Sequence, residues 1–216
     1  MNKVKTAILI SGRGSNMTAL INAANDPSFP AEITIVISND PSARGLEMAK
    51  SLGTKADIID HTKYASRGSF EDAVHKCLTS ESVELVCLAG FMRILGPDFI
   101  SKWQRRLLNI NPSLLPAFRG LHTHEKALEA GVKIHGCTVH HVVPDLDAGP
   151  IISQAAVPVL ENDTDATLAA RVLEAELHLY PEALRRTALA LRGTDLPNAG
   201  RADEIVSLFS PPLGKN

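Results

Sequence analysis

Short apolar runs alternate with amphipathic stretches over the first ninety residues of the chain. Runs of β-branched and aliphatic residues predict four strands, at Thr6–Ile10, Ile33–Ser38, Ala56–Ile59 and Leu85–Ala89. Apolar positions at helical spacing predict three helices between them, at Asn16–Ala24, Ala43–Leu52 and Ser69–Ser80. Alternation of this kind implies right-handed crossovers, and continuously apolar strands are typical of a parallel sheet that is covered on both faces.

The pattern changes after Gly90. Three further strands are predicted at Leu107–Asn111, Ile134–Val143 and Ile151–Val159, and two helices at Thr123–Ala130 and Asp163–Arg186. Pro181 is expected to kink the last helix or to divide it in two. We therefore predict an α/β fold with a mostly parallel, doubly wound sheet. A single domain is expected over residues 1–190, and the pattern assigns no structure to the C-terminal tail, residues 191–216.

Composition narrows the classes of partner. Apolar residues make up 44% of the chain and charged residues 21%, which is an ordinary globular balance. A net charge of −2 gives no basic field for nucleic acid. The three cysteines are too few and too scattered for a disulfide framework, and no apolar stretch reaches membrane-spanning length. We expect a cytoplasmic protein, a monomer or homodimer, that acts on small molecules and binds neither nucleic acid nor membrane.

A glycine-containing loop, Ile10–Asn16, joins the first predicted strand to the first helix. Its Gly14, Ser15 and Asn16 stand where free helix amides favour an anion, although a plain strand-to-helix turn fits these residues equally well. The loop has no third glycine at the dinucleotide-binding spacing, which argues against a nicotinamide dehydrogenase. It also lacks the Gly-Lys-Ser/Thr ending of a nucleotide P-loop. A single phosphate suits it better than a pyrophosphate.

Two asparagines, Asn109 and Asn111, lie at the end of the fifth predicted strand. Side chains two residues apart share one face of a strand, and ligands of open α/β sheets usually bind at this edge. Taken alone, these two residues more commonly close a strand and begin a turn.

Six segments in a fixed order resemble the glycinamide ribonucleotide formyltransferase family. Together they span most of residues 5 to 182, and they are Ile10–Asn16, Leu88–Leu95, Asn109–Pro116, Gly120–His124, His135–His140 and Asp145–Pro150. The resemblance implies a Rossmann-like formyltransferase fold. It also implies transfer of a formyl group from 10-formyltetrahydrofolate to the amine of 5′-phosphoribosylglycinamide in de novo purine biosynthesis, without a metal.

The resemblance also implies roles for individual residues. Asn109 and Asp147 match catalytic positions, and Glu176 matches a carboxylate that contacts the glycinamide portion. The loop residues Gly14, Ser15 and Asn16 match the site of the substrate phosphate. The folate side is matched by Arg67, Met92, Arg93, Ile94, Leu95, Val143, Pro144, Asp145 and Leu146.

The third catalytic position departs from the family pattern. Where the family usually reads Asn-Ile-His-Pro-Ser, this chain has Asn111 in place of the histidine, and Leu177 replaces a second common histidine. An amide donates hydrogen bonds but does not titrate near neutral pH, and losing a general acid typically costs about 10²–10⁴-fold in rate. We therefore expect reduced turnover with substrate binding largely kept. Asp147 is also expected to lose the positive partner that favours its ionised form.

Several histidines lie close in sequence to this segment, and one of them could take the place of the missing catalytic histidine. They are His122, His124, His135, His140 and His141. The strand containing His140 and Thr138 could turn one face inward, but packing or solvent exposure is the simpler interpretation for most of the five. A metal held by His122 and His124 is conceivable and less favoured.

Formyl transfer to the small amine has three alternatives. Hydrolysis of the formyl donor and transfer to methionyl-tRNA are disfavoured because the chain has no room for the additional domains that the resembling proteins carry. A catalytically impaired relative that binds folate or sugar phosphate as a sensor is favoured only by Asn111.

Overall fold

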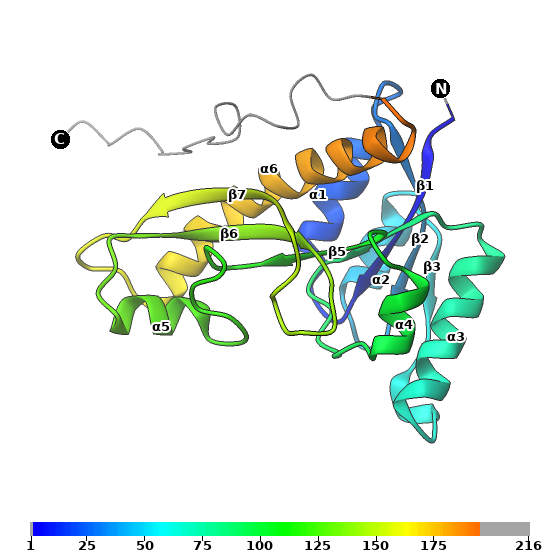
Figure 1. Ribbon diagram of the computed structural model, residues 1–216, viewed down its shortest axis with the longest axis horizontal. Helices are drawn as coiled ribbons and strands as arrows, with labels where there is room; N and C mark the ends of the chain where they lie inside the picture. Colours follow the sequence, from blue (N-terminus) through cyan, green and yellow to red (C-terminus); the bar gives the residue numbers. More distant parts are fainter. Residues whose placement is uncertain (1, 195–216) are drawn as a thin grey trace.

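A computed structural model of the chain describes residues 2–194, and these form a seven-stranded sheet with helices on both faces (Figure 1). The strands are β1 (Val4–Ile10), β2 (Ala31–Ser38), β3 (Ala56–Ile58), β4 (Leu85–Leu88), β5 (Leu107–Asn111), β6 (Ile134–His141) and β7 (Ile151–Pro158). Their order in the sheet is β3-β2-β1-β4-β5-β6-β7. Strands β1 to β5 run parallel, whereas β6 and β7 pair antiparallel. The predicted mostly parallel α/β sheet is confirmed.

The helices include every predicted one and two elements that the sequence patterns missed. They are α1 (Ser15–Ala24), α2 (Gly45–Ser51), α3 (Arg67–Ser80), α4 (Pro97–Lys102), α5 (Thr123–Glu129) and α6 (Asp165–Leu191). The missed elements are α4 and a three-residue 3-10 helix at His61–Lys63, both too short to establish a period. The boundary predicted at residue 190 falls in the last turn of α6, and residues 195–216 of the predicted tail lie outside the described residues.

Helix α6 is continuous through Pro181, so the predicted possibility that this proline divides the helix is wrong. Proline has no N–H and leaves the carbonyl of Leu177 without its helical donor. Packing outweighs that loss, because Tyr180, Ala183 and Leu184 are fully buried against the sheet. The Tyr180 hydroxyl also lies 3.0 Å from the carbonyl oxygen of Leu88 and 3.3 Å from that of Leu108, and so bridges β4 and β5.

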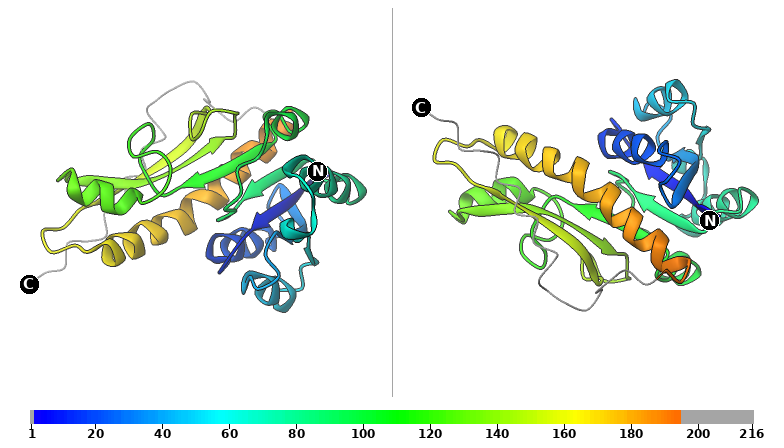
Figure 2. Two further views of the ribbon diagram at one scale, coloured as in Figure 1. Left: turned by 90° about the horizontal axis from the view of Figure 1, so that it is seen from below. Right: turned by 90° about the horizontal axis from the view of Figure 1, so that it is seen from above.

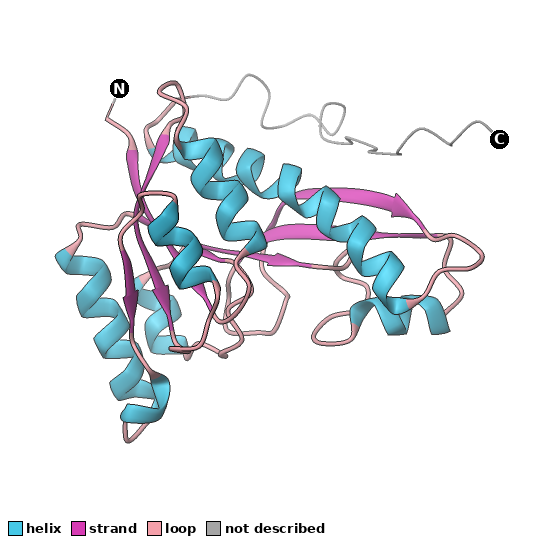
Figure 3. Cartoon of the chain, turned by 180° about the vertical axis from the view of Figure 1, so that it is seen from behind, coloured by secondary structure: helices cyan, strands magenta, loops and turns pink. Residues whose placement is uncertain are grey.

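Alternate residues of the central strands face two separate cores. On β1, Ile8 and Ile10 pack with α1 and α6, whereas Ala7 and Leu9 pack with α3 and α4. Figures 2 and 3 show the long helix α6 crossing one side of the sheet. Both faces are therefore dry, which explains why the strand sequences are continuously apolar. None of the helices in the described part of the chain is both long and apolar enough to cross a membrane.

The sheet extends beyond α3 and α4 on the side of β6 and β7 (Figure 1). There, the loop after β5 takes the place of a helix: the Leu115 amide donates to Thr138 Oγ1 at 3.0 Å, and Gln154 Nε2 donates to the Leu115 carbonyl at 2.9 Å. Polar side chains of β5 and β6 therefore meet loops instead of an apolar helix face.

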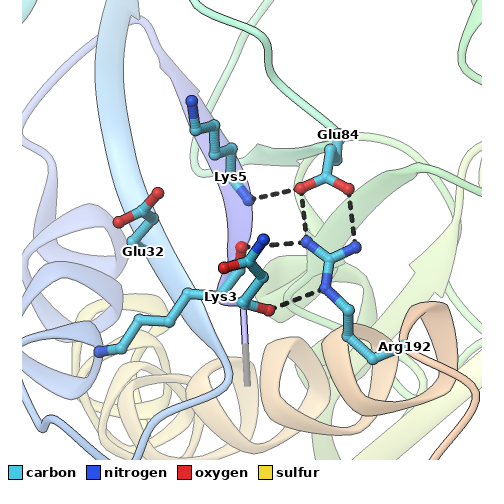
Figure 4. Close-up of a pocket in the computed structure, with 6 residues that line it drawn as sticks. Lys3, Lys5, Glu32, Glu84 and Arg192 are labelled. Carbon is cyan, nitrogen blue, oxygen red and sulfur yellow. Dashed lines mark hydrogen bonds and ion pairs between the residues drawn. The ribbon is translucent and has the colours of Figure 1, made fainter.

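A charged cluster ties the end of α6 to the start of β1 (Figure 4). The Arg192 guanidinium makes two hydrogen bonds to Glu84, at 2.7 and 2.6 Å, and donates to the carbonyl oxygens of Asn2 and Lys3 at 2.9 and 3.0 Å. The bidentate geometry fixes the direction of both groups. These contacts lie at the amino-terminal ends of β1 and β4, opposite to the edge where the predicted site residues gather.

Substitution of Gly136 by alanine is expected to weaken the fold. A Cβ at this position would overlap the backbone of β7 at Ala155 and Ala156, which cannot move without separating the two strands. We expect Gly136→Ala to lower the free energy of unfolding by about 3 kcal/mol, measured by urea denaturation. Gly68→Ala in α3 is the control, because its Cβ would meet only Ser66 Oγ, at 3.9 Å; it should raise stability by about 0.5–1 kcal/mol. Equal stability of the two variants would contradict the expected clash.

Candidate active site

The two asparagines of β5 share one face, as predicted. Leu108 and Ile110 belong to the core beneath α6, and Leu107 belongs to the core beneath α3 and α4. Asn109 and Asn111 follow Leu107 at intervals of two and therefore point to its side of the sheet. In the antiparallel register with β6, Asn109 lies opposite His140 and Asn111 opposite Thr138. This brings His140 into the group of side chains at the end of β5.

The carboxylate of Asp147 is the centre of this group. Asn111 Nδ2 donates to Asp147 Oδ2 at 2.7 Å, and the Gly120 amide donates to the same oxygen at 2.9 Å. His140 Nε2 lies 3.6 Å from Asp147 Oδ1. Burial alone would raise the pKa of Asp147, but the hydrogen bond from the Gly120 amide and the nearby charge of Arg119 hold it below its ordinary value. The Asp147 carboxylate is therefore ionised at neutral pH, although Asn111 offers no positive charge.

Asn111 is fully engaged by its neighbours. Its Oδ1 accepts from Ser113 Oγ at 2.9 Å while its Nδ2 donates to Asp147, so the orientation of the amide is fixed at both ends. The side chain is buried. It can orient the carboxylate, but it has no proton to exchange.

The loop before α1 has the geometry of an anion site. Gly14 adopts a left-handed φ of 82°, and a Cβ there would lie 3.0 Å from both Gly45 and Met17. No side chain caps α1 and its first turn holds no acidic residue. The first amides of a helix have no intrahelical acceptor, so those of Ser15 and Asn16 are available to a ligand.

Glu176 on α6 joins this loop to the site. Its Oε2 accepts from Asn16 Nδ2 at 2.7 Å, and burial raises its pKa to about 7 despite that hydrogen bond. A cavity of about 440 Å³ opens beside it; the lining residues are Arg13, Pro112, His124, Ala166, Ala169, Ala170, Val172, Leu173 and Glu176. The structure thus brings the glycine loop, the end of β5 and α6 around one cavity.

Arg13 was missed by the sequence reasoning. It stands between the two loop glycines, is exposed, and makes no ion pair with any residue in the described range 2–194. Its charge and its place between Gly12 and Gly14 were available signals. That it faces the same cavity as Glu176 depends on the fold.

Except for Arg67, which is the first residue of α3, the residues matched to the folate side lie on two loops. Met92, Ile94 and Leu146 are large apolar side chains with 64%, 72% and 59% exposure, and Arg93 is also exposed. Leu95, in contrast, is buried in the core beneath α3 and α4, so only its main chain can face a ligand. Val143 is partly buried, while Pro144 and Asp145 are exposed on the loop between β6 and β7.

Contacts connect the first of these loops to its neighbours. The Met92 amide donates to Ser11 Oγ at 2.8 Å, which links it to the glycine loop. The buried carboxylate of Glu71 accepts from the Gly96 amide at 2.7 Å and lies 3.7 Å from Arg67 Nε. Arg67 is therefore held beside this loop, with its side chain largely exposed.

The five histidines near the site have different surroundings. Only His140 contacts Asp147 or Asn109 within residues 2–194, and it is 2% exposed. His122 is exposed beside Glu125. His124 packs edge-on against His135, with ring centroids 5.3 Å apart. The described part of the chain contains no cluster of three or more His, Cys, Asp or Glu side chains suited to a metal.

Comparison with known proteins identifies the family. The formyl transferase family model matches residues 4–184. The chain belongs to the formyl transferase family. It is 38% identical to the phosphoribosylglycinamide formyltransferase of Haemophilus influenzae over 93% of this chain and 99% of that protein. It is also 52% identical to the trifunctional purine biosynthetic protein adenosine-3 of Gallus gallus, covering 87% of this chain but only 19% of that longer protein.

Solved structures of family members share the fold. The phosphoribosylglycinamide formyltransferase of Brucella melitensis superposes with a TM-score of 0.84 at 51% identity, covering 87% of this chain and 96% of that one. Glycinamide ribonucleotide transformylase 1 of Symbiobacterium toebii superposes with a TM-score of 0.85 at 45% identity, covering 87% and 89%. The formyl transferase fold of this chain is therefore the one that the resemblance implied.

Two buried groups near the cavity are expected to have opposite effects on stability. Burial, with His124 nearby, lowers the pKa of His135 to about 4, so its contribution is present above about pH 6.5 and is lost as the pH falls. Burial raises the pKa of Glu176 to about 7, so its contribution is present below about pH 4.5 and is lost as the pH rises. Over the shared window the two effects oppose one another, each on the order of 3 kcal/mol.

Single substitutions should separate these effects. From about pH 5 to about pH 6.5, we expect Glu176→Gln to gain stability relative to the wild type and His135→Leu to lose it. Urea denaturation of the three proteins at both pH values measures this. If the free energy of unfolding changed with pH in the same way in all three proteins, neither Glu176 nor His135 would have a shifted pKa.

Proposed function

We propose that this chain transfers the formyl group of 10-formyltetrahydrofolate to the amine of 5′-phosphoribosylglycinamide; two of its relatives are named phosphoribosylglycinamide formyltransferase. The observation that carries the proposal is the arrangement around the end of β5. An amide (Asn109) and an ionised carboxylate (Asp147) both contact His140 there, and the same region includes an uncapped helix start and two loops with exposed apolar side chains. The pairing of sites suits one phosphorylated substrate and one aromatic co-substrate.

The substrate side is the cavity beside α6. The amides of Gly14, Ser15 and Asn16 would hold the phosphate, with the Arg13 guanidinium supplying charge. Glu176 would accept from the glycinamide portion. An N–H donor of the bound substrate favours the ionised carboxylate, so bound substrate would return the pKa of Glu176 toward its usual range.

The folate side is formed by the exposed loops. Met92, Ile94 and Leu146 would cover the apolar surface of the co-substrate, with Arg93, Val143, Pro144 and Asp145 around them and Leu95 contributing its main chain. Arg67 would face the acidic end. We place this enzyme in the cytoplasm, as a monomer or homodimer that needs no metal.

The chemistry requires a C–N bond to form at the formyl carbon and the C–N bond to the folate to break. The amine attacks as a neutral nucleophile, and the Asn109 amide would donate to the developing oxyanion. Asp147 would take the proton released by the attacking nitrogen, directly or through water, and the same proton would return to the departing folate nitrogen. Because its pKa is low, Asp147 is a weak base that holds a proton only briefly.

Asn111 would limit this proton path. It orients Asp147 through its 2.7 Å hydrogen bond, but it adds neither positive charge nor an exchangeable proton. We therefore propose reduced turnover with substrate binding kept. The alternative, a catalytically impaired relative that only binds folate or sugar phosphate, rests on the same residue.

Replacing Asn111 with histidine tests this role. We expect Asn111→His to raise kcat by about 10²-fold or more, with both KM values nearly unchanged, because an imidazole restores proton exchange. The measurement is the absorbance change of tetrahydrofolate release from the two substrates. Asn111→Ala is the matched control and should not be faster than the wild type. No amine-dependent release from any of these proteins would favour the binding-protein alternative.

Replacing Arg13 tests the phosphate site. We expect Arg13→Gln to raise the KM for phosphoribosylglycinamide by about 10–100-fold at unchanged kcat, because a charge-assisted hydrogen bond contributes about 1.5–3 kcal/mol. Ribosylglycinamide without the phosphate should show no such change. Arg186→Gln on the far part of α6 is the control. An equal effect on the two substrates would exclude Arg13 from phosphate binding.

A further inference from the structure

His140 is a buried imidazole that the proposed reaction does not use directly. It lies on β6 opposite Asn109, with both of its ring nitrogens in polar contacts. Nδ1 is 2.9 Å from the carbonyl oxygen of His141. A carbonyl oxygen only accepts, so Nδ1 carries the hydrogen.

This hydrogen bond determines what Nε2 can do. In the neutral ring, Nε2 then carries a lone pair, and Asn109 Nδ2 lies 3.3 Å from it. Asn109 therefore donates one N–H to His140 and keeps the other for the reacting centre. If Nε2 carried a hydrogen instead, it would face Asp147 Oδ1 at 3.6 Å, and the Asn109 amide would have to turn its oxygen toward the ring.

The orientation of Asn109 matters for chemistry. An amide N–H stabilises a developing oxyanion, whereas an amide oxygen in the same place repels it. The two orientations differ only by a half-turn of the side chain, so a neighbour must select one of them. Within residues 2–194, His140 is the side chain that hydrogen-bonds to Asn109.

We propose that His140, as the neutral Nδ1–H tautomer, is a positioning residue that locks the Asn109 amide with its N–H groups toward the reacting atoms. The inference rests on the proposed formyl transfer. His140 is too deeply buried to touch substrate and acts through Asn109, while its edge also limits the movement of Asp147. With the non-titrating Asn111 on the other side of Asp147, this ring is the sole imidazole at the carboxylate in the described part of the chain.

Two substitutions separate the roles of the two ring nitrogens. Asparagine places an amide near the position of Nδ1 and removes the acceptor at Nε2, whereas glutamine reaches the position of Nε2. We expect His140→Asn to lower kcat by roughly tenfold or more with both KM values nearly unchanged, and His140→Gln to keep most of the wild-type kcat. In an Asn109→Ala background, His140→Asn should cause no further loss. His75→Gln on α3 is the control.

These experiments test the role of His140 separately from formyl transfer itself. Equal losses in His140→Asn and His140→Gln, or losses that multiply with Asn109→Ala, would overturn it. Histidine ¹⁵N chemical shifts of the wild-type protein, assigned by comparison with His140→Gln, report the tautomer without any assay. An Nε2–H tautomer there would overturn the proposal even if the enzyme is active. Nδ1–H without formyl transfer in the wild type would support the geometry and reject the proposed function.

Discussion

A buried, ionised carboxylate requires hydrogen-bond donors, and the arrangement of the site follows from how Asp147 obtains them. Its hydrogen-bond donors come from two separate segments, the end of β5 and the loop at Gly120, and His140 of strand β6 lies 3.6 Å from its other oxygen. Asp147 itself has a left-handed φ of 49°, a conformation that is uncommon for a residue other than glycine. The Asp147 carboxylate therefore connects the end of β5 to the loop at Gly120.

The local periodicity of the sequence predicted most of the fold. The strand Leu107–Asn111 has the predicted bounds, and the shared face of its two asparagines follows from the period of a strand. Alternation of strand and helix also predicted the parallel sheet. These features depend on neighbours within a few residues, where side-chain spacing is decisive.

Contacts between distant residues could not be predicted in the same way. The pairing of His140 with Asn109 depends on the antiparallel register of β5 and β6, and the hydrogen bond from Asn16 to Glu176 joins residues 160 positions apart. The continuity of α6 through Pro181 depends on burial against the sheet. Tertiary packing outweighed the local preference at Pro181, and it brought together the distant residues of the other two contacts. The roles matched to the folate loops came from the resemblance and stay predictions.

The charged cluster of Arg192 and Glu84 affects how this domain can be joined to other domains in a longer protein. Through it, Asn2 and the residue that follows α6, Arg192, lie side by side at the amino-terminal ends of β1 and β4. Figure 4 shows Arg192 beside Lys3 and Glu84. A neighbouring module attached at Asn2 would join the domain at the amino-terminal ends of the strands, whereas the reacting centre lies at their carboxyl ends. This arrangement is compatible with a domain that is joined to others, and the matching region of the trifunctional relative makes up about a fifth of that protein.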